Sequence, residues 1–120
     1  MTRDEIEELT APFLAADLAI DVRSVYDDHL TAGESHGMAT AAVFATFRNV
    51  LDDPDDGPVV FLAIAAIQLR ERAVLEPIRD AAIALITSGD AQKAYRPADA
   101  NISRDRKVAL NQLAGLLADA

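Results

Sequence analysis

The chain has 120 residues and a formal net charge of −9, and 51% of its residues are hydrophobic although only 5% are aromatic. It contains no cysteine, which excludes disulfides, thiolate metal sites and cysteine nucleophiles. The length predicts a single domain over residues 1–120 with one hydrophobic core.

The charge is unevenly distributed and bears on the kind of partner. Residues 1–56 carry 13 acidic side chains against 3 basic ones, whereas residues 57–120 carry 7 against 8. Nucleic acid requires a basic stripe, and Arg104, Arg106 and Lys107 are too few on an acidic body. An anionic membrane is disfavoured for the same reason, and no apolar run is long enough to span a bilayer. Because the charged N-terminus lacks a signal-peptide core, we expect a cytoplasmic protein that binds neither nucleic acid nor membrane.

The first part of the chain predicts a short helix and a long one. Residues 3–9 can form the short helix. Thr10 then has the side chain of an N-cap, and apolar residues at helical spacing predict a helix over residues 11–32. Gly33 is predicted to end this helix, because glycine adopts the left-handed conformation without strain.

Ser35 is predicted to cap a second helix over residues 36–51, with a broad apolar stripe. The following stretch contains two prolines, a glycine and four aspartates, and therefore predicts a loop. Residues 58–72 should form a third helix that is apolar on nearly all sides. A buried strand was the alternative, but the alanines and the length of the run favour a central buried helix.

The last part of the chain predicts two further helices. One covers residues 76–88 and ends at Gly89. Residues 90–102 should be irregular apart from one turn, and Ser103 is predicted to cap a helix over residues 103–118. No segment alternates with a period of two, so the predicted fold is all-α. Short connections favour a single up-and-down bundle of four to five helices.

Two stretches resemble an uncharacterised family of small bacterial helical domains. Residues 19–23 with Tyr26 are similar to the family pattern Ala-Leu-Asp-Val-Arg-Asp-x-Tyr, and residues 51–59 match its Asp-Asp-Pro-Asp-Asp-Gly-Pro loop. The resemblance extends over about residues 17–118 and is specific mainly at the loop. It implies a bacterial helical domain and no established activity.

The chain also departs from this family. Phe61 and Leu69 stand near positions where members carry tryptophan, and residues 66–67 replace an Asp-Thr pair. If that pair belongs to a functional site, this chain lacks the site.

The acidic loop is the strongest candidate for a cation site. It consists of Asp52, Asp53, Asp55 and Asp56, followed by Gly57 and Pro58. Clustered carboxylates suit hard cations, but the spacing does not fit a calcium loop. We therefore predict no metal and a structural role, in which Asp55 and Asp56 precede a helix N-terminus that favours negative charge.

Two other sets of polar residues have two interpretations each. Asp17, Asp21 and Asp28 lie at helical spacing on one face, close to Arg23, and form either a binding face or a solvated acidic face. A metal pair there would need Glu-x-x-His motifs, which the chain lacks. Gln68 lies in the predicted central helix, so its amide must be hydrogen-bonded, as a core anchor or as a ligand contact. The two histidines have no partner at metal-ligand spacing.

Three classes of function stay open on these residues. The first, which the acidic charge favours, is a protein-interaction module that docks on a basic or apolar surface of a protein partner, or on a second copy in a homodimer. The second is an immunity-like or antitoxin-like inhibitor of one cognate protein. The third is a small-ligand binder or an enzyme. Because the chain has no nucleophile motif and no phosphate loop, we predict no catalytic residue and no cofactor.

Overall fold

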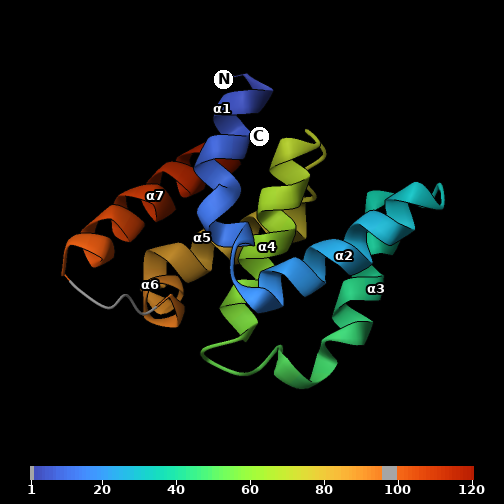
Figure 1. Cartoon of the computed structure of the whole chain (residues 1–120), viewed down its shortest axis with the longest axis horizontal. Helices are drawn as coiled ribbons and strands as arrows, with labels where there is room; N and C mark the ends of the chain where they lie inside the picture. The colour runs from blue at the N-terminus through green and yellow to red at the C-terminus, as the bar shows by residue number, and fades with distance from the viewer. Residues whose placement is uncertain (1, 96–99) are drawn as a thin grey trace.

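The computed structural model describes residues 2–95 and 100–120, which form an all-α fold (Figure 1). The predicted fold class is confirmed, and no β-strand occurs among the described residues. The elements in chain order are α1 (Arg3–Thr10), the 3-10 helix η1 (Ala11–Leu14), α2 (Asp17–Thr31), α3 (His36–Thr46), the 3-10 helix η2 (Arg48–Val50), α4 (Gly57–Arg70), α5 (Glu76–Ser88), α6 (Asp90–Ala94) and α7 (Ala100–Ala118).

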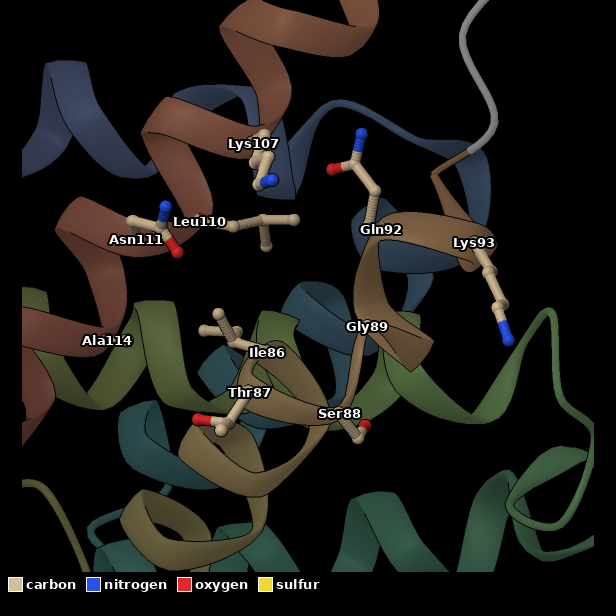
Figure 2. Close-up of a pocket in the computed structure, with 10 residues that line it drawn as sticks. All are labelled: Ile86, Thr87, Ser88, Gly89, Gln92, Lys93, Lys107, Leu110, Asn111 and Ala114. Atoms are coloured by element: carbon tan, nitrogen blue, oxygen red, sulfur yellow. The ribbon is translucent and has the colours of Figure 1, made fainter.

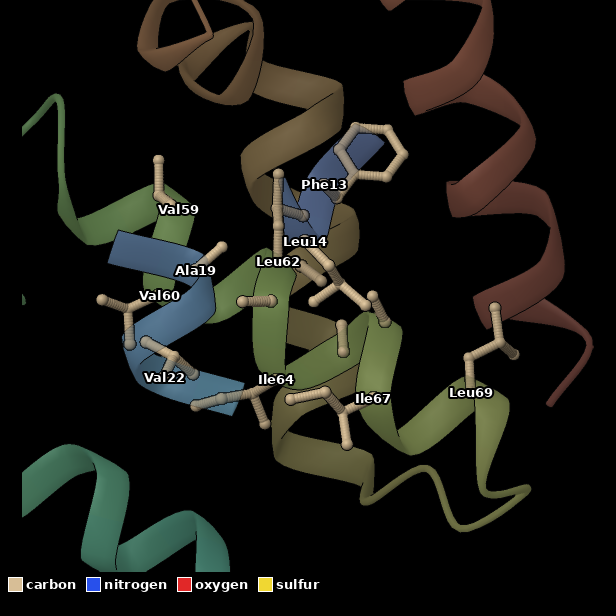
Figure 3. Close-up of a cluster of buried hydrophobic side chains, with 14 of the residues drawn as sticks. Phe13, Leu14, Ala19, Val22, Val59, Val60, Leu62, Ile64, Ile67 and Leu69 are labelled. Atoms are coloured by element: carbon tan, nitrogen blue, oxygen red, sulfur yellow. The ribbon is translucent and has the colours of Figure 1, made fainter. Parts of the chain in front are cut away.

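Helix α4 is the central element, as its all-round apolarity predicts. Every residue from Gly57 to Leu69 is buried except Phe61, which is half-buried. Helices α1, α2, α5, α6 and α7 all contact it. Figure 3 shows Phe13 of η1 and Val22 of α2 beside the buried side chains of α4. None of the described helices is long and apolar enough to span a membrane.

The prediction of one helix over residues 11–32 is wrong in its first part. Thr10 does not cap a helix, because it is the last residue of α1 and its Oγ1 donates a hydrogen bond to a carbonyl within that helix. Pro12, which has no N–H, sits in the tighter turn of η1. Phe13 is fully buried, and Ala16 is extended, so the chain changes direction before α2 begins.

The end of α2 agrees with the prediction at Gly33, which has a φ of +86°. The N–H of Gly33 donates to the Leu30 carbonyl and that of Glu34 to the His29 carbonyl, both at 3.0 Å. These two bonds form a Schellman motif. The end of α4 repeats the pattern around Arg72, a non-glycine residue with a φ of +54°.

Two of the remaining helix boundaries differ from the prediction, at the end of α3 and at the start of α7. The cap at Ser35 is as predicted, since its Oγ accepts the Met38 N–H at 3.1 Å, but α3 ends at Thr46 and not at residue 51. Helix α5 ends at Gly89 as predicted, with a φ of +88°. The one turn predicted within residues 90–102 is the short helix α6, and residues 96–99 lie outside the described part. The predicted cap at Ser103 is wrong, because α7 has already begun at Ala100.

Candidate functional site

The predicted binding residues of α2 lie on its exposed side. Asp17 is the first residue of the helix, where a carboxylate interacts favourably with the helix dipole. Asp21 is exposed one turn later, and Arg23 forms an ion pair with Asp27 at 3.5 Å. Ile20, 52% exposed, is the one large apolar side chain beside them. This geometry is that of a solvated helix face. Asp17 and Asp21 stay exposed, and among the described residues Arg23 forms an ion pair only with Asp27.

The acidic loop is organised by Asp53. Its Oδ1 accepts the backbone N–H groups of Asp55 at 2.8 Å and Asp56 at 2.9 Å, and its carbonyl accepts the Gly57 N–H at 2.8 Å. The two N–H donors lower the pKa of the Asp53 carboxyl below its usual value, because they stabilise the charged form. Asp56 is the N-cap residue of α4 but makes no capping bond with its side chain.

Glycine is required at position 57 because the backbone of Leu51 leaves no room there for a side chain. A Cβ at this position would lie 2.4 Å from the Leu51 carbonyl oxygen, so no other residue fits without moving the backbone. Pro58 follows in the first turn of α4, where its missing N–H costs nothing. Asp53, Gly57 and Pro58 therefore have a structural role in the turn that leads into the central helix. Among the described residues, no group of three or more His, Asp and Glu side chains is placed to hold a metal ion.

Gln68 anchors a buried polar network. Its side chain is fully buried, its Nε2 donates to Thr40 Oγ1 at 3.0 Å, and its Oε1 accepts the Leu75 N–H at 2.9 Å. Thr40 Oγ1 in turn donates to the His36 carbonyl at 2.7 Å. The amide thus connects α4 to α3 and to the chain entering α5, and Gln68 lines none of the hollows described below.

Both histidines are used within the α2–α3 connection. His36 Nδ1 hydrogen-bonds the Tyr26 hydroxyl at 2.8 Å, and His29 Nδ1 pairs with the Glu34 carboxylate. Burial raises the pKa of Tyr26, and hydrogen bonding with Gln68 and Thr40 offsets part of that effect. Tyr26 and His36 therefore hold α2 against α3.

Arg106 contacts aromatic rings and not carboxylates. Its guanidinium carbon lies 4.9 Å from the ring centre of Tyr95 and 6.0 Å from that of Phe13, within cation–π range. The two rings meet edge to face at 5.7 Å. Burial raises the pKa of Tyr95, and Arg106 acts against that shift. Of the three clustered cations, Arg106 is therefore engaged by these two rings, and the Arg104 side chain lies outside the described part.

A surface hollow that the sequence did not reveal lies between α3, α4 and α5. This α3–α5 groove has a volume of about 510 Å³ and is lined by Ala41, Phe44, Ala45, Arg48, Leu51, Phe61, Pro77 and Ile78. The rings of Phe44 and Phe61 pack at 5.4 Å with a tilt of 49°. Phe44 and Phe61 belong to the apolar residues of the two helices predicted over residues 36–51 and 58–72, and both are only half-buried.

A second, smaller hollow of about 230 Å³ adjoins the α3–α5 groove. The two share Leu51 and Phe61, and the smaller one is also lined by Asp52, Asp53 and Asp90. An apolar surface and a carboxylate-lined surface therefore meet at Phe61.

No protein-family model matches the chain, and neither a curated protein nor a solved structure does. The resemblance to the uncharacterised bacterial family therefore stays a prediction.

Proposed function

We propose that the chain is a protein-interaction module whose α3–α5 groove receives the apolar face of a helix from a basic partner protein. The observation that carries this proposal is the junction at Phe61 between an apolar groove and a carboxylate-lined hollow. Such a junction fits a helix with apolar residues on one face and a lysine or arginine near one end.

The apolar character of α3 supports the proposal. The helix carries no Asp, Glu, Lys or Arg, yet only Ala39, Thr40 and Val43 are buried in it. Its main packing partner is α2, and Met38 stays 54% exposed. An apolar helix face that its own fold does not cover is a common mark of an interaction site.

The shape of the groove suits a helix. Ala41 and Ala45 lie one turn apart on α3, and their small side chains would let a second helix approach closely. Phe44 and Phe61 form an aromatic floor that could receive an apolar side chain of the partner. Half-buried aromatic pockets of this kind often contribute most of the affinity at protein interfaces.

The charge of the chain and of the adjoining hollow favours a basic partner. Asp52, Asp53 and Asp90 line the adjoining hollow, and the whole chain has a net charge of −9. Complementary charge raises association rates and disfavours like-charged partners, which include a second copy of this chain. Arg48 is the one basic residue of the groove, and it would meet a carboxylate or carbonyl of the partner.

The test uses a synthetic amphipathic helical peptide with leucines on one face and lysines at one end, and backbone NMR shifts of the full chain locate its binding site. We expect shifts in α3, at Phe61 and in the acidic loop. Ala45→Glu should weaken binding at least about tenfold, because it places a carboxylate against the apolar face of the peptide. Ala118→Glu, the same change at an exposed alanine of α7, is the matched control and should leave binding unchanged.

Two double variants with the same change in net charge distinguish recognition of the peptide at the groove from its general attraction to an acidic protein. Asp52→Asn with Asp90→Asn changes the net charge as much as Glu5→Gln with Glu8→Gln on the exposed side of α1. The first pair should weaken binding more than the second. The proposal fails if both pairs act equally, if a peptide with glutamates in place of lysines binds as well, or if the peptide shifts only residues outside the groove and the acidic loop. Dimerisation of the chain through the groove, without peptide binding, would also refute a basic partner.

A further inference from the structure

A third hollow, the α5–α7 groove, lies on the part of the molecule where α5, α6 and α7 meet and has a volume of about 590 Å³ (Figure 2). Ile86, Leu110 and Ala114 form its apolar part, and Leu110 is only 2% exposed. Figure 2 shows Lys107 and Asn111 on the α7 side of the groove and Gln92 on the α6 side. The volume lies in the range of small-molecule sites, and the lining combines three apolar side chains with several polar ones that could orient a ligand.

The charge of this groove is opposite to that of the chain. Two lysines, Lys93 and Lys107, line it and no acidic residue does, although the chain carries nine more acidic than basic side chains. Neither lysine forms an ion pair with a described residue. The two lysines differ in direction, since Lys93 points away from α7 in Figure 2.

The neighbouring elements contribute little negative charge to the groove. The second half of α5 and all of α4 before Arg70 contain no charged residue. Asp90 of α6 and Asp105 of α7 are exposed, and neither lines the groove. Lys107 therefore offers an ammonium to the groove without a competing carboxylate on its wall.

We infer that the α5–α7 groove binds a small organic carboxylate with an apolar body, independently of the α3–α5 groove. The carboxylate accepts hydrogen bonds from the Lys107 ammonium and the Asn111 amide, and the apolar body covers Ile86, Leu110 and Ala114. A phosphate dianion fits less well, because one inward ammonium and one amide leave most of its oxygens unpaired beside an apolar wall.

The experiment titrates the full chain with octanoate, octanol and inorganic phosphate, and follows backbone NMR shifts. Octanoate should bind saturably and shift Thr87, Gly89, Asn111 and their neighbours, whereas octanol and phosphate should bind at least about tenfold more weakly. Lys107→Gln should weaken octanoate binding at least about tenfold, because a charge-assisted hydrogen bond is lost.

Lys93→Gln is the matched control, since it removes the same charge from the same groove at a side chain that points elsewhere. It should change the octanoate affinity less than about twofold, within the range expected for a screened surface charge. Equal binding of octanol and octanoate would show that the groove recognises only the apolar body. Equal losses in the two lysine variants would show general attraction to positive charge, and shifts that do not saturate would show no site. Each of these three results overturns the inference.

Discussion

Replacement of Gln68 with leucine tests the buried polar network most directly. Leucine has a similar size and helix propensity to glutamine, so the change removes polar contacts without leaving a large cavity. Two hydrogen bonds disappear, one to Thr40 at 3.0 Å and one from the Leu75 N–H at 2.9 Å, and the interaction of the amide with the Tyr26 hydroxyl is also lost. Thr40 keeps its bond to the His36 carbonyl, whereas the Leu75 N–H loses the acceptor that Gln68 supplied.

The magnitude follows from these losses. Each hydrogen bond contributes about 1 kcal/mol, and the half-buried Leu75 N–H left unpaired costs about 1–3 kcal/mol. Burial of an apolar side chain in place of an amide returns about 1–2 kcal/mol. We therefore expect Gln68→Leu to lower the free energy of unfolding by about 2 kcal/mol, even though it makes the central helix more hydrophobic.

Urea unfolding followed by circular dichroism measures this loss. With a slope typical of a small domain, a loss of about 2 kcal/mol lowers the midpoint by about 1 M at an unchanged slope. Gln112→Leu, the same change at an exposed position of α7, should stay within about 0.5 kcal/mol of the unmodified chain. A double-mutant cycle with Thr40→Val should give a coupling of about 1 kcal/mol. An unchanged midpoint for Gln68→Leu, or equal losses for Gln68→Leu and Gln112→Leu, would refute the role of the network.

The same unfolding measurement tests four further substitutions. Tyr95→Phe should leave stability unchanged or raise it by up to about 1 kcal/mol, because the buried Tyr95 hydroxyl has no hydrogen-bond partner among the described residues. Tyr26→Phe should lower stability by about 1 kcal/mol, since it removes the bond to His36. If Tyr95→Phe and Tyr26→Phe both lowered the stability, or both raised it, the two predictions would be contradicted. Asp53→Ala should destabilise near neutral pH. The folded pKa of Asp53 lies below its usual value of 3.8, so the carboxylate stabilises the fold above that pH, and this stabilisation is lost as pH falls through the folded pKa. If the stability difference between Asp53→Ala and the unmodified chain did not change with pH, this explanation would be refuted. Leu62→Ala should cost about 2–5 kcal/mol, and an unchanged midpoint would show that the burial of α4 is misjudged.

The central helix could be predicted because the evidence for it lies within its own stretch of sequence. An apolar run without period-two alternation predicts a buried helix whatever packs around it, and the buried Gln68 amide then requires hydrogen-bond partners. The identity of those partners was not predictable. Thr40 lies 28 residues away in sequence, and its contact with Gln68 depends on how α3 folds back toward α4.

The start of α2 was mispredicted because the local signals fit two structures equally. A threonine before Ala-Pro can cap a following helix or end a preceding one. Burial of Thr10 and Phe13 against the core decides between them, and it favours a turn of 3-10 helix followed by an extended Ala16. Such a choice is made by tertiary packing and cannot be read from spacing.

The candidate site was less predictable than the fold for a related reason. Both hollows consist of surface that remains after the helices have packed, and no motif marks such surface. Phe44 and Phe61 belong to apolar stripes, as the spacing predicts, but their exposure depends on the gap between α3 and α5. An apolar stripe indicates which side chains favour burial. Only the packing of the helices determines which of them are buried.

The most specific sequence pattern in the chain turns out to have a structural explanation. Asp53 closes the loop through two N–H groups, and Gly57 is fixed by a carbonyl that leaves no room for a Cβ. Any domain that enters a buried helix by this turn needs both residues, whichever partner or ligand it binds. The loop pattern therefore has a structural cause and does not by itself indicate an activity. Function must then be sought in residues that the turn does not require, such as Asp52 beside the α3–α5 groove and Lys107 in the α5–α7 groove, because their solvent-exposed charges are free of any comparable structural requirement.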